Sequence, residues 1–393
     1  MSRRSGLDVV VIGAGVVGAA TALTLAAAGL RVGIVEAHEP APWRADAPDL
    51  RVYAFAPDSS ALLERLRLWH DIRGARTQPY RNMRVWDAAG GGELRFDADA
   101  VGREALGHIV EHGLLVDRLW QRVRADARIE VHCPDKLLAL EQDETGVSLA
   151  LQGGARLHAR FALGADGAVS RVRDQLGIES DAHDYGQRGV VAYVSTELPH
   201  EQTAWQRFLP SGPLAFLPCA DGRSSIVWTL SNDEAERVLA LPDDGFCREL
   251  TRAFDARLGD VLEVSARAAF PLRRQLAKTM LLGRVALVGD AAHAVHPLAG
   301  QGVNLGLRDV SALDDSVREA LQRGIDPFSP HRMQRWARAR YSENAMAAYG
   351  FEAINRVFSN DALLPTLLRG HALGIAGRLP PLTRFLWKRA AGV

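Results

Sequence analysis

The chain has 393 residues, of which 47% are hydrophobic and 24% charged, a mixture typical of soluble globular proteins and long enough for two domains with hydrophobic cores. Lysine plus arginine and aspartate plus glutamate each total 47, so the formal net charge is zero and no global positive field favours nucleic acid as a partner. The three cysteines, Cys133, Cys219 and Cys247, match no metal-binding spacing, and such a sparse set is typical of a reducing compartment.

The N-terminal segment predicts a dinucleotide-binding βαβ unit. A β-branched run at 9–12 is followed by Gly13, Gly15 and Gly18 in the pattern G-x-G-x-x-G, then by a helix-forming stretch, and then by a second strand that ends at Glu36. The first glycine allows the turn, the second lets a pyrophosphate approach, and the third lets helix and strand pack. Glu36 would accept hydrogen bonds from ribose hydroxyls.

The same segment has an alternative interpretation as a targeting or membrane signal. Arg3 and Arg4 precede an uncharged run over 9–30, a pattern compatible with a twin-arginine signal or a transmembrane helix. The β-branched residues at its start favour a strand, and the three glycines interrupt it at defined intervals. The sequence therefore predicts a cytoplasmic protein.

Two later segments each place a glycine–aspartate pair after a strand. The strand over 156–163 runs into Gly164-Ala165-Asp166-Gly167, where the acid either caps a short helix or contributes to a cofactor site. The strand over 285–288 stops at Gly289-Asp290, and a loop containing Pro297, Gly300 and Gly302 leads into a helix. Free N–H groups at such a helix start favour an anionic or strongly polar ligand.

Short strand patterns over 190–230 predict an antiparallel meander with many aromatic residues, either as a core or as the wall of an apolar pocket. Along one strand, alternation places Trp205 on one face and Phe208 on the other. The arginine- and leucine-rich tail predicts helices that either pack on the domains or present an amphipathic surface to a membrane or partner.

Together, the three glycine-containing motifs resemble those of the single-component, para-hydroxybenzoate-hydroxylase-like FAD-dependent aromatic monooxygenases of class A. A closer resemblance is to the ubiquinone-biosynthesis hydroxylases within this class. It covers almost the whole chain and is carried by Arg51 and by the segments 206–218, 289–306 and 355–361. The chain departs from the family pattern Glu-Asn-x-x-x-Gln, which reads Glu111-His112-Gly113-Leu114-Leu115-Val116 here, so the glutamine credited with an FAD contact is a valine.

This resemblance implies an α/β fold: a Rossmann-like FAD-binding domain, an inserted antiparallel-sheet substrate domain and a helical C-terminal tail. The expected boundaries are 1–75, 98–180 and 270–330 for the FAD-binding domain, 76–97 and 181–269 for the substrate domain, and 331–393 for the helical region.

The resemblance also implies a cofactor site and two residues near the chemistry. His296 would act as a base toward the phenol, with structural hydrogen bonding as the alternative, and Pro297 would shape the oxygen pocket. The expected cofactor-binding residues are Gly13, Gly15, Gly18, Glu36, Arg51, Asp166, Gly289, Asp290, Pro297, Gly300, Gln301 and Gly302. No metal is expected.

The implied reaction is hydroxylation of the ring of a polyprenylated phenol, with NAD(P)H and O₂ as co-substrates and a flavin C4a-hydroperoxide as the oxygen donor. Alternatives are a different aromatic substrate, another flavoenzyme such as an oxidase, or a non-catalytic flavoprotein subunit of a biosynthetic complex. The C-terminal helices would supply any peripheral contact with the inner face of a membrane or with a ubiquinone-biosynthesis complex.

Overall fold

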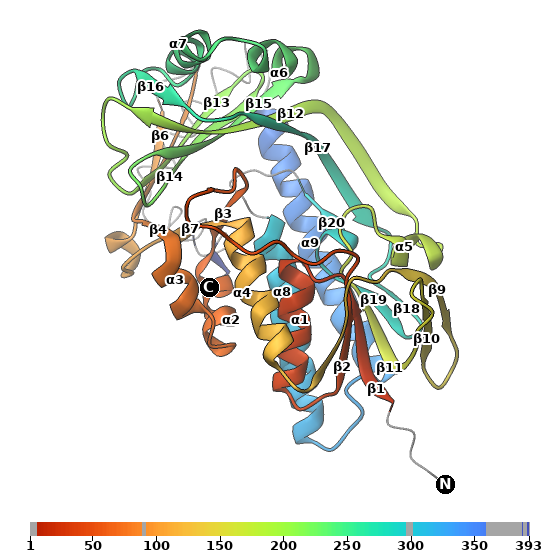
Figure 1. The fold of residues 1–393 in the computed structure, drawn as a ribbon. Helices are drawn as coiled ribbons and strands as arrows, with labels where there is room; N and C mark the ends of the chain where they lie inside the picture. Colours follow the sequence, from red (N-terminus) through yellow and green to blue (C-terminus); the bar gives the residue numbers. More distant parts are fainter. Residues whose placement is uncertain (1–5, 89–91, 296–301, 359–386, 388–390, 393) are drawn as a thin grey trace.

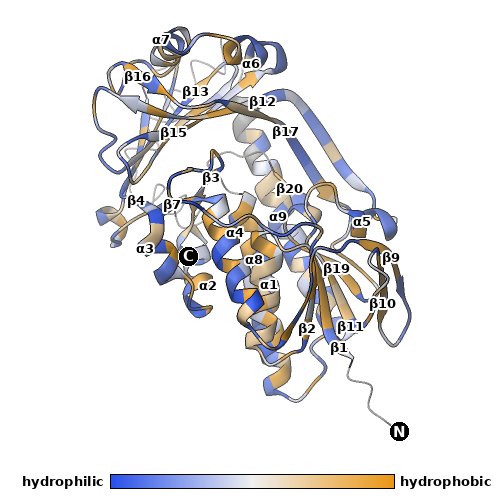
Figure 2. Ribbon diagram, viewed as in Figure 1, coloured by the Kyte–Doolittle hydropathy of each residue, from blue (hydrophilic) through white to orange (hydrophobic). Residues whose placement is uncertain are grey.

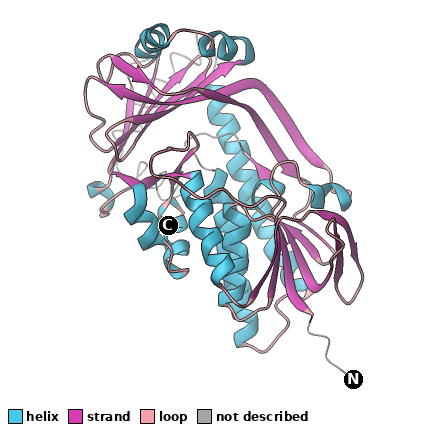
Figure 3. Cartoon of the chain, viewed as in Figure 1, coloured by secondary structure: helices cyan, strands magenta, loops and turns pink. Residues whose placement is uncertain are grey.

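The computed structural model describes residues 6–88, 92–295, 302–358, 387 and 391–392, which form three β-sheets and their covering helices (Figures 1 and 3). The helices are α1 (Val16–Ala27), α2 (Pro57–Arg65), α3 (Trp69–Arg76), η1 (Asp99–Val101), α4 (His112–Ala125), α5 (Arg171–Gln175), α6 (Asn232–Leu239), α7 (Asp243–Ala253), η2 (Gly289–Ala291), α8 (Gly302–Gln322) and α9 (Pro330–Phe358).

The strands fall into an eight-stranded, a three-stranded and a nine-stranded sheet. The first contains β1 (Leu7–Ile12), β2 (Val32–Val35), β8 (Ile129–His132), β9 (Leu137–Gln142), β10 (Val147–Leu151), β11 (Arg156–Gly164), β18 (Leu281–Leu282) and β19 (Val285–Leu287). The second contains β3 (Val52–Phe55), β4 (Thr77–Tyr80) and β7 (Gly107–Glu111). The third contains β5 (Asn82–Asp87), β6 (Glu93–Asp97), β12 (Ser180–Thr196), β13 (Thr203–Leu209), β14 (Gly212–Pro218), β15 (Ser224–Ser231), β16 (Val261–Val264), β17 (Ala268–Ala277) and β20 (His293–Ala294).

A parallel core runs through the eight-stranded sheet in the order β19-β11-β1-β2-β8. Its central strand β1 is fully buried at Val9, Val10 and Val11, because α1 covers one face and the sheet is enclosed on the other. The hydropathy colouring shows the same concentration of apolar residues along these strands (Figure 2). Strands buried on both faces read as continuous apolar runs, which explains why this part of the fold was predictable.

The carboxyl ends of the parallel strands meet at one edge in close register. Ile12 pairs with both Val35 and Gly164, and Gly164 pairs with Leu287. Backbone hydrogen bonds continue this alignment beyond the strands, from Ala165 N to Ile12 O (2.8 Å) and from Val288 N to Gly164 O (2.9 Å). The three glycine-containing motifs are therefore neighbours in space, although they are distant in sequence.

The nine-stranded sheet carries α6 and α7 on its outer face. The predicted alternation along β13 is confirmed, because Trp205 packs in the core shared with these helices whereas Phe208 packs with Val85 and Leu94. The predicted meander holds only for β13, β14 and β15. Strand β12 lies beside β15 instead of β13, and β13 pairs with β5 in parallel, because strand neighbours depend on long-range packing as well as on sequence order.

Strands β12 and β17 form the long ribbon that joins the two large sheets (Figure 1). Their pairing extends from Ser180–Ala277 to Val191–Ala268 and includes an irregularity between Asp184 and Arg188. The part of this ribbon between the sheets is hydrophilic (Figure 2).

The predicted α/β fold class, with a Rossmann-like parallel sheet and an inserted, largely antiparallel sheet, is confirmed. In the part of the chain that the structure describes, no helix combines the length and hydrophobicity needed to cross a membrane.

Candidate active site

The glycine-rich turn before α1 forms the first part of the site. Gly13 has a φ of +104°, and a Cβ there would lie 2.4 Å from the carbonyl oxygen of Ala165, so the first and second motifs touch. A Cβ on Gly18 would lie 2.0 Å from the carbonyl oxygen of Gly13. Gly15 differs, because a Cβ there would lie within 4 Å of no atom in the described part of the chain, and Gly15 caps α1 without a side-chain hydrogen bond. Packing thus explains Gly13 and Gly18, whereas Gly15 leaves room for a ligand at the helix start.

Glu36 lies against this turn. One of its carboxylate oxygens, Oε2, accepts a hydrogen bond from Ala14 N at 2.6 Å, and Oε1 accepts from His38 N at 3.1 Å. The carboxylate is therefore fixed beside the glycine-rich turn, where it retains acceptor capacity for a hydroxyl group. Its predicted contact with a ribose stays a prediction.

Arg51 immediately precedes β3 and is exposed, with its guanidinium 5.3 Å from the ring centroid of Tyr53. Its backbone N–H donates to Asp49 Oδ1 at 2.9 Å. The adjoining strand is fastened to α8 by Asn304, which is fully buried and donates to Ala54 O and accepts from Ala56 N, both at 2.9 Å. Arg51 is thereby held near the start of α8, free to meet an anion.

Asp166 is used internally. Its Oδ1 accepts from Ser170 Oγ at 2.5 Å and its Oδ2 from Val172 N at 3.0 Å, which is the helix-capping alternative for this residue. Burial raises the pKa of Asp166 despite these hydrogen bonds. Arg173 connects the second motif to the third, because its guanidinium donates hydrogen bonds to Ala168 O (3.0 Å) and to Ala291 O (3.1 Å). A direct cofactor contact for Asp166 stays a prediction.

The third motif presents Asp290 at the same sheet edge. Gly289 has a φ of +60°, and a Cβ on Gly306 of α8 would lie 3.2 Å from Gly289 Cα and 2.5 Å from Val17 of α1. Asp290 is half-buried, and its carboxylate accepts no hydrogen bond from the residues that the structure describes. A partly buried carboxylate that has no partner among the described residues can accept hydrogen bonds from ligand hydroxyls.

Four of the predicted site residues, His296, Pro297, Gly300 and Gln301, lie outside the described residues. Gly302 is the first residue of α8, and no atom of the described residues lies within 4 Å of the position its Cβ would take. It therefore resembles Gly15 in leaving space at a helix start.

Glu111, for which the sequence predicts no role, organises the loop before Arg51. Its carboxylate accepts two hydrogen bonds from Arg76 (2.6 and 3.1 Å), one from Trp43 Nε1 (3.1 Å) and one from Asp49 N (3.1 Å). The signal available in the sequence was that Glu111 is the retained acid of the Glu-Asn-x-x-x-Gln pattern. Its partners come from two separate segments, the loop before β3 and the end of α3, and could not be inferred from that pattern.

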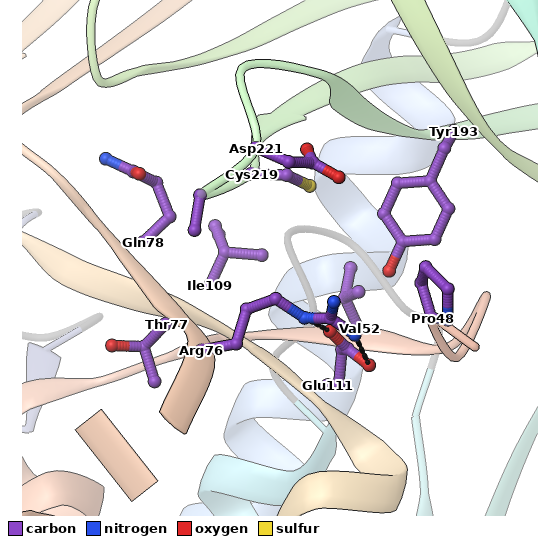
Figure 4. A pocket seen from close by; sticks show the side chains of 11 residues that line it. Pro48, Val52, Arg76, Thr77, Gln78, Ile109, Glu111, Tyr193, Cys219 and Asp221 are labelled. Carbon is purple, nitrogen blue, oxygen red and sulfur yellow. Dashed lines mark hydrogen bonds and ion pairs between the residues drawn. The ribbon is translucent and has the colours of Figure 1, made fainter. Parts of the chain in front are cut away.

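Beside this ion pair is a pocket between the three-stranded and nine-stranded sheets (Figure 4). Tyr193 reaches down from β12 toward Pro48, and its hydroxyl donates to Asp49 O at 2.7 Å. Burial raises the pKa of Tyr193, and it raises the pKa of Cys219 to about 12, so both are neutral at pH 7. The lining residues are Pro48, Val52, Arg76, Thr77, Gln78, Ile109, Glu111, Tyr193, Cys219, Ala220 and Asp221.

His112 takes the asparagine position of the same pattern and pairs with Tyr53, with His112 Nδ1 3.0 Å from the tyrosine hydroxyl. Burial, reinforced by the positive charge of Arg51, lowers the pKa of His112 to about 4. Burial raises the pKa of Tyr53 to about 12, with the nearby charges of Arg51 and Asp290 acting in opposite directions. This neutral pair therefore lies within electrostatic reach of both predicted cofactor contacts.

The comparisons with known proteins identify the cofactor of this chain. Residues 6–337 match the family described as FAD binding domain. The p-nitrophenol 4-monooxygenase PnpA from Pseudomonas putida DLL-E4 has the same fold, with a TM-score of 0.80 at 21% identity over 98% of both chains. The chain is thus a flavoprotein with the fold of the FAD-dependent monooxygenases.

Curated relatives define the family more narrowly. The chain is 37% identical to ubiquinone hydroxylase UbiL of Rhodospirillum rubrum, over 98% of this chain and 89% of that protein. It is 36% identical to the 3-demethoxyubiquinol 3-hydroxylase of Escherichia coli, over 98% of both. The chain belongs to the ubiquinone-biosynthesis hydroxylase family of FAD-dependent aromatic monooxygenases.

The described residues fit FAD as the cofactor. The space beyond Gly15 and the free N–H groups at the start of α1 suit a pyrophosphate, and Arg51 offers a cation nearby. Asp290 offers an acceptor for hydroxyls. The carboxyl edge of the parallel sheet can therefore hold a negatively charged, hydroxyl-rich molecule in an extended form across the ends of β2, β1, β11 and β19.

Two alanine substitutions distinguish a ligand-facing glycine from a packing glycine. Gly15→Ala is expected to weaken FAD binding at least tenfold while changing the stability of the apoprotein by less than about 1 kcal/mol, because its Cβ enters only the ligand space. Gly18→Ala is expected to destabilise the apoprotein by about 1–3 kcal/mol, because its Cβ meets backbone. Fluorescence titration of apoprotein with FAD and chemical denaturation measure the two effects. If Gly15→Ala binds FAD as tightly as the wild type, the pyrophosphate does not occupy the space beyond Gly15.

The buried neutral state of His112 predicts a pH dependence of stability. Its folded pKa of about 4 lies below the usual value of about 6.5, so the unfolded chain binds the extra proton between these pH values. The wild type should lose stability relative to His112→Asn by roughly 2–3 kcal/mol as the pH falls from about 6.5 to about 4. Denaturation at several pH values measures this difference. His331→Asn, at an exposed position, serves as the control, and parallel profiles for wild type and His112→Asn would contradict the prediction.

Proposed function

We propose that this chain hydroxylates the aromatic ring of a polyprenylated phenol in ubiquinone biosynthesis, with NAD(P)H and O₂ as co-substrates. The observation that carries the proposal is the near full-length similarity to two ubiquinone-pathway hydroxylases, at 37% and 36% identity. The geometry agrees with it, because the FAD edge faces a separate sheet that can wall a substrate pocket.

The proposed cofactor contacts follow from the positions of the three motifs. Asp290 accepts from ribitol hydroxyls, Glu36 from the adenosine ribose, and Arg51 lies by the pyrophosphate. The N–H groups of Gly300, Gln301 and Gly302, with the start of α8, stabilise negative charge at the flavin N1–C2 carbonyl edge. When bound, FAD supplies the redox chemistry, accepting a hydride from NAD(P)H and activating O₂ for transfer to the ring.

The protein's own contribution is to position the phenol, exclude water and control its proton. His296 is proposed as the base that accepts the phenol proton, which raises the electron density of the ring, and Pro297 as a wall of the oxygen pocket. Domain boundaries of 1–75, 98–180 and 270–330 for FAD, and 76–97 and 181–269 for substrate, are also part of the proposal. The membership of β5, β6 and β12–β16 in the nine-stranded sheet supports them, although β17 and β20 of the 270–330 segment join the same sheet.

The inner face of that sheet joins the three-stranded sheet through a small apolar core. Ala204, Ala215 and Leu217 pack against Ala54 and Ile109 of the three-stranded sheet, in a small core next to the pocket of Figure 4. The lining of that pocket is part apolar, at Val52 and Ile109, and part charged, at Arg76, Glu111 and Asp221.

A cytoplasmic location with a peripheral membrane or complex contact through the C-terminal region, 331–393, completes the proposal. Helix α9 exposes Tyr341, Met346 and Tyr349, which are 38%, 53% and 50% accessible. An enzyme that takes an apolar substrate from a membrane needs an exposed apolar surface with which to contact that membrane.

The proposed base role predicts that His296→Ala slows substrate hydroxylation more than flavin reduction. Loss of the base leaves a less reactive ring, whereas hydride transfer to the cofactor needs no phenol deprotonation. Stopped-flow measurement of the two half-reactions separates them, with His293→Gln as the comparison. If His296→Ala slows both half-reactions equally, His296 is not the base and its role is structural.

The function itself is tested by deleting the gene in its host and identifying the quinone precursor that accumulates. We expect a prenylated phenol lacking one ring hydroxyl. The purified protein is expected to be yellow and to oxidise NAD(P)H faster in the presence of that precursor, with hydroxylated product formed. Normal quinone content after deletion, together with turnover of a simple phenol, would favour the alternative of a different aromatic substrate. NAD(P)H oxidation that no aromatic compound increases would favour a non-catalytic flavoprotein subunit.

A further inference from the structure

Asp309 of α8 joins the cofactor-facing segment to the C-terminal helix through a single carboxylate. Its Oδ2 accepts from Gly289 N at 3.1 Å and lies 2.6 Å from His293 Nε2. Its Oδ1 accepts from Arg340 Nε at 2.9 Å and from Asn344 Nδ2 at 3.0 Å. Oδ2 of Asp309 thus contacts the segment around Asp290, and Oδ1 contacts α9.

This hub is sealed from solvent. Asp309 is 0% exposed, and His293, Arg340 and Asn344 are 1%, 4% and 1% exposed. Burial alone would favour the neutral acid. The charges of His293 and Arg340, with the hydrogen bonds from His293 and Asn344, outweigh the effect of burial and lower the pKa of Asp309 to about 2. A carboxylate that is ionised, buried and bound by four donors has little freedom to move.

The two contacts on Oδ2 bracket Asp290. Gly289 lies immediately before it and His293 three residues after it, while Ala291 between them is held by Arg173 at 3.1 Å. The position of the Asp290 carboxylate therefore depends on the position of Asp309.

His293 has no access to a substrate in this arrangement. Its Nε2 carries the donated proton, because the Asp309 carboxylate only accepts, and its Nδ1 is buried without a hydrogen-bond partner in the described part of the chain. An atom sealed from solvent on all sides cannot exchange a proton with a bound phenol, so the contribution of His293 is to hold the segment.

Arg340 and Asn344 lie beyond residue 337, where the match to the FAD-binding family ends. We propose that Asp309 is a positioning residue for FAD, and that Arg340 and Asn344 of α9 set the position of Asp290 through it. This inference rests on the proposed contact of Asp290 with FAD. It gives the part of α9 that follows residue 337 a role in cofactor binding, although that part lies beyond the matched region.

The test compares Arg340→Met and Asn344→Leu with Arg338→Met, which changes an exposed arginine of the same helix whose only side-chain hydrogen bond among the described residues is to Gln334 O. FAD affinity is measured by fluorescence titration of the apoproteins, and apoprotein stability by chemical denaturation. Arg340→Met and Asn344→Leu are each expected to weaken FAD binding about tenfold, the size typical of losing one hydrogen bond to a charged group, whereas Arg338→Met leaves it unchanged.

A double-mutant cycle with Asp290→Ala separates positioning from general destabilisation. If Arg340 acts through Asp290, Arg340→Met weakens FAD binding in the wild type but not further in Asp290→Ala, while its effect on apoprotein stability is the same in both. Equal weakening in both backgrounds, or affinities in Arg340→Met and Asn344→Leu equal to that of Arg338→Met, would overturn the proposal. Unchanged FAD affinity in Asp290→Ala alone would instead refute the proposed Asp290 contact.

Discussion

The parallel pairing of β19 with β11 is the contact on which the cofactor site depends. It spans only Ala162–Val285, Leu163–Ala286 and Gly164–Leu287, yet it brings a segment from after the inserted sheet back beside β1. Without this register, Asp290 would not share an edge with the glycine-rich turn. A slip by one residue would move every side chain to the opposite face, and the buried strand cannot tolerate that change.

Close packing between glycines then brings the motifs into contact. Gly13 touches the backbone of Ala165, and Gly306 lets α8 approach both Gly289 and α1. These contacts have no room for a methyl group, so they fix the distance between elements. Gly15 and Gly302 have the opposite environment, because each starts a helix at a position where a Cβ would meet no atom of the described residues. The same residue type thus serves two physical purposes within one site.

Most of the charged groups around the site are already paired within the protein. Glu36 binds the glycine-rich turn, Asp166 caps α5, Glu111 holds the loop before Arg51, and Asp309 ties α8 to α9. They form a rigid frame in which Asp290 is left without a hydrogen-bond donor among the described residues. The lack of a donor to Asp290, rather than the number of charges around the site, distinguishes Asp290 as the carboxylate available to a ligand. The frame also extends to α9, so the C-terminal helix is part of the structure that supports the cofactor.

Local patterns in the sequence were sufficient for the βαβ unit, the two later Gly-Asp turns and the α/β fold class. Strand runs, helix-forming stretches and glycine spacing act over a few residues, and their consequences do not depend on distant partners. The three motifs together were also specific enough to indicate the flavoprotein class. They placed Gly13, Glu36 and Gly289 at strand ends, where the structure has them.

Tertiary structure alone decided which atoms pair. The pattern around Asp166 allowed a cap or a cofactor contact, and folding committed both of its oxygens to α5. The partners of Glu111 and Asp309, and the position of β12 beside β15, join segments far apart in the chain. Hydrogen-bond partners and strand neighbours are set by which surfaces pack together when the whole chain closes. No local spacing encodes that choice, which is why the fold class was readable in the sequence and the network that positions Asp290 was not.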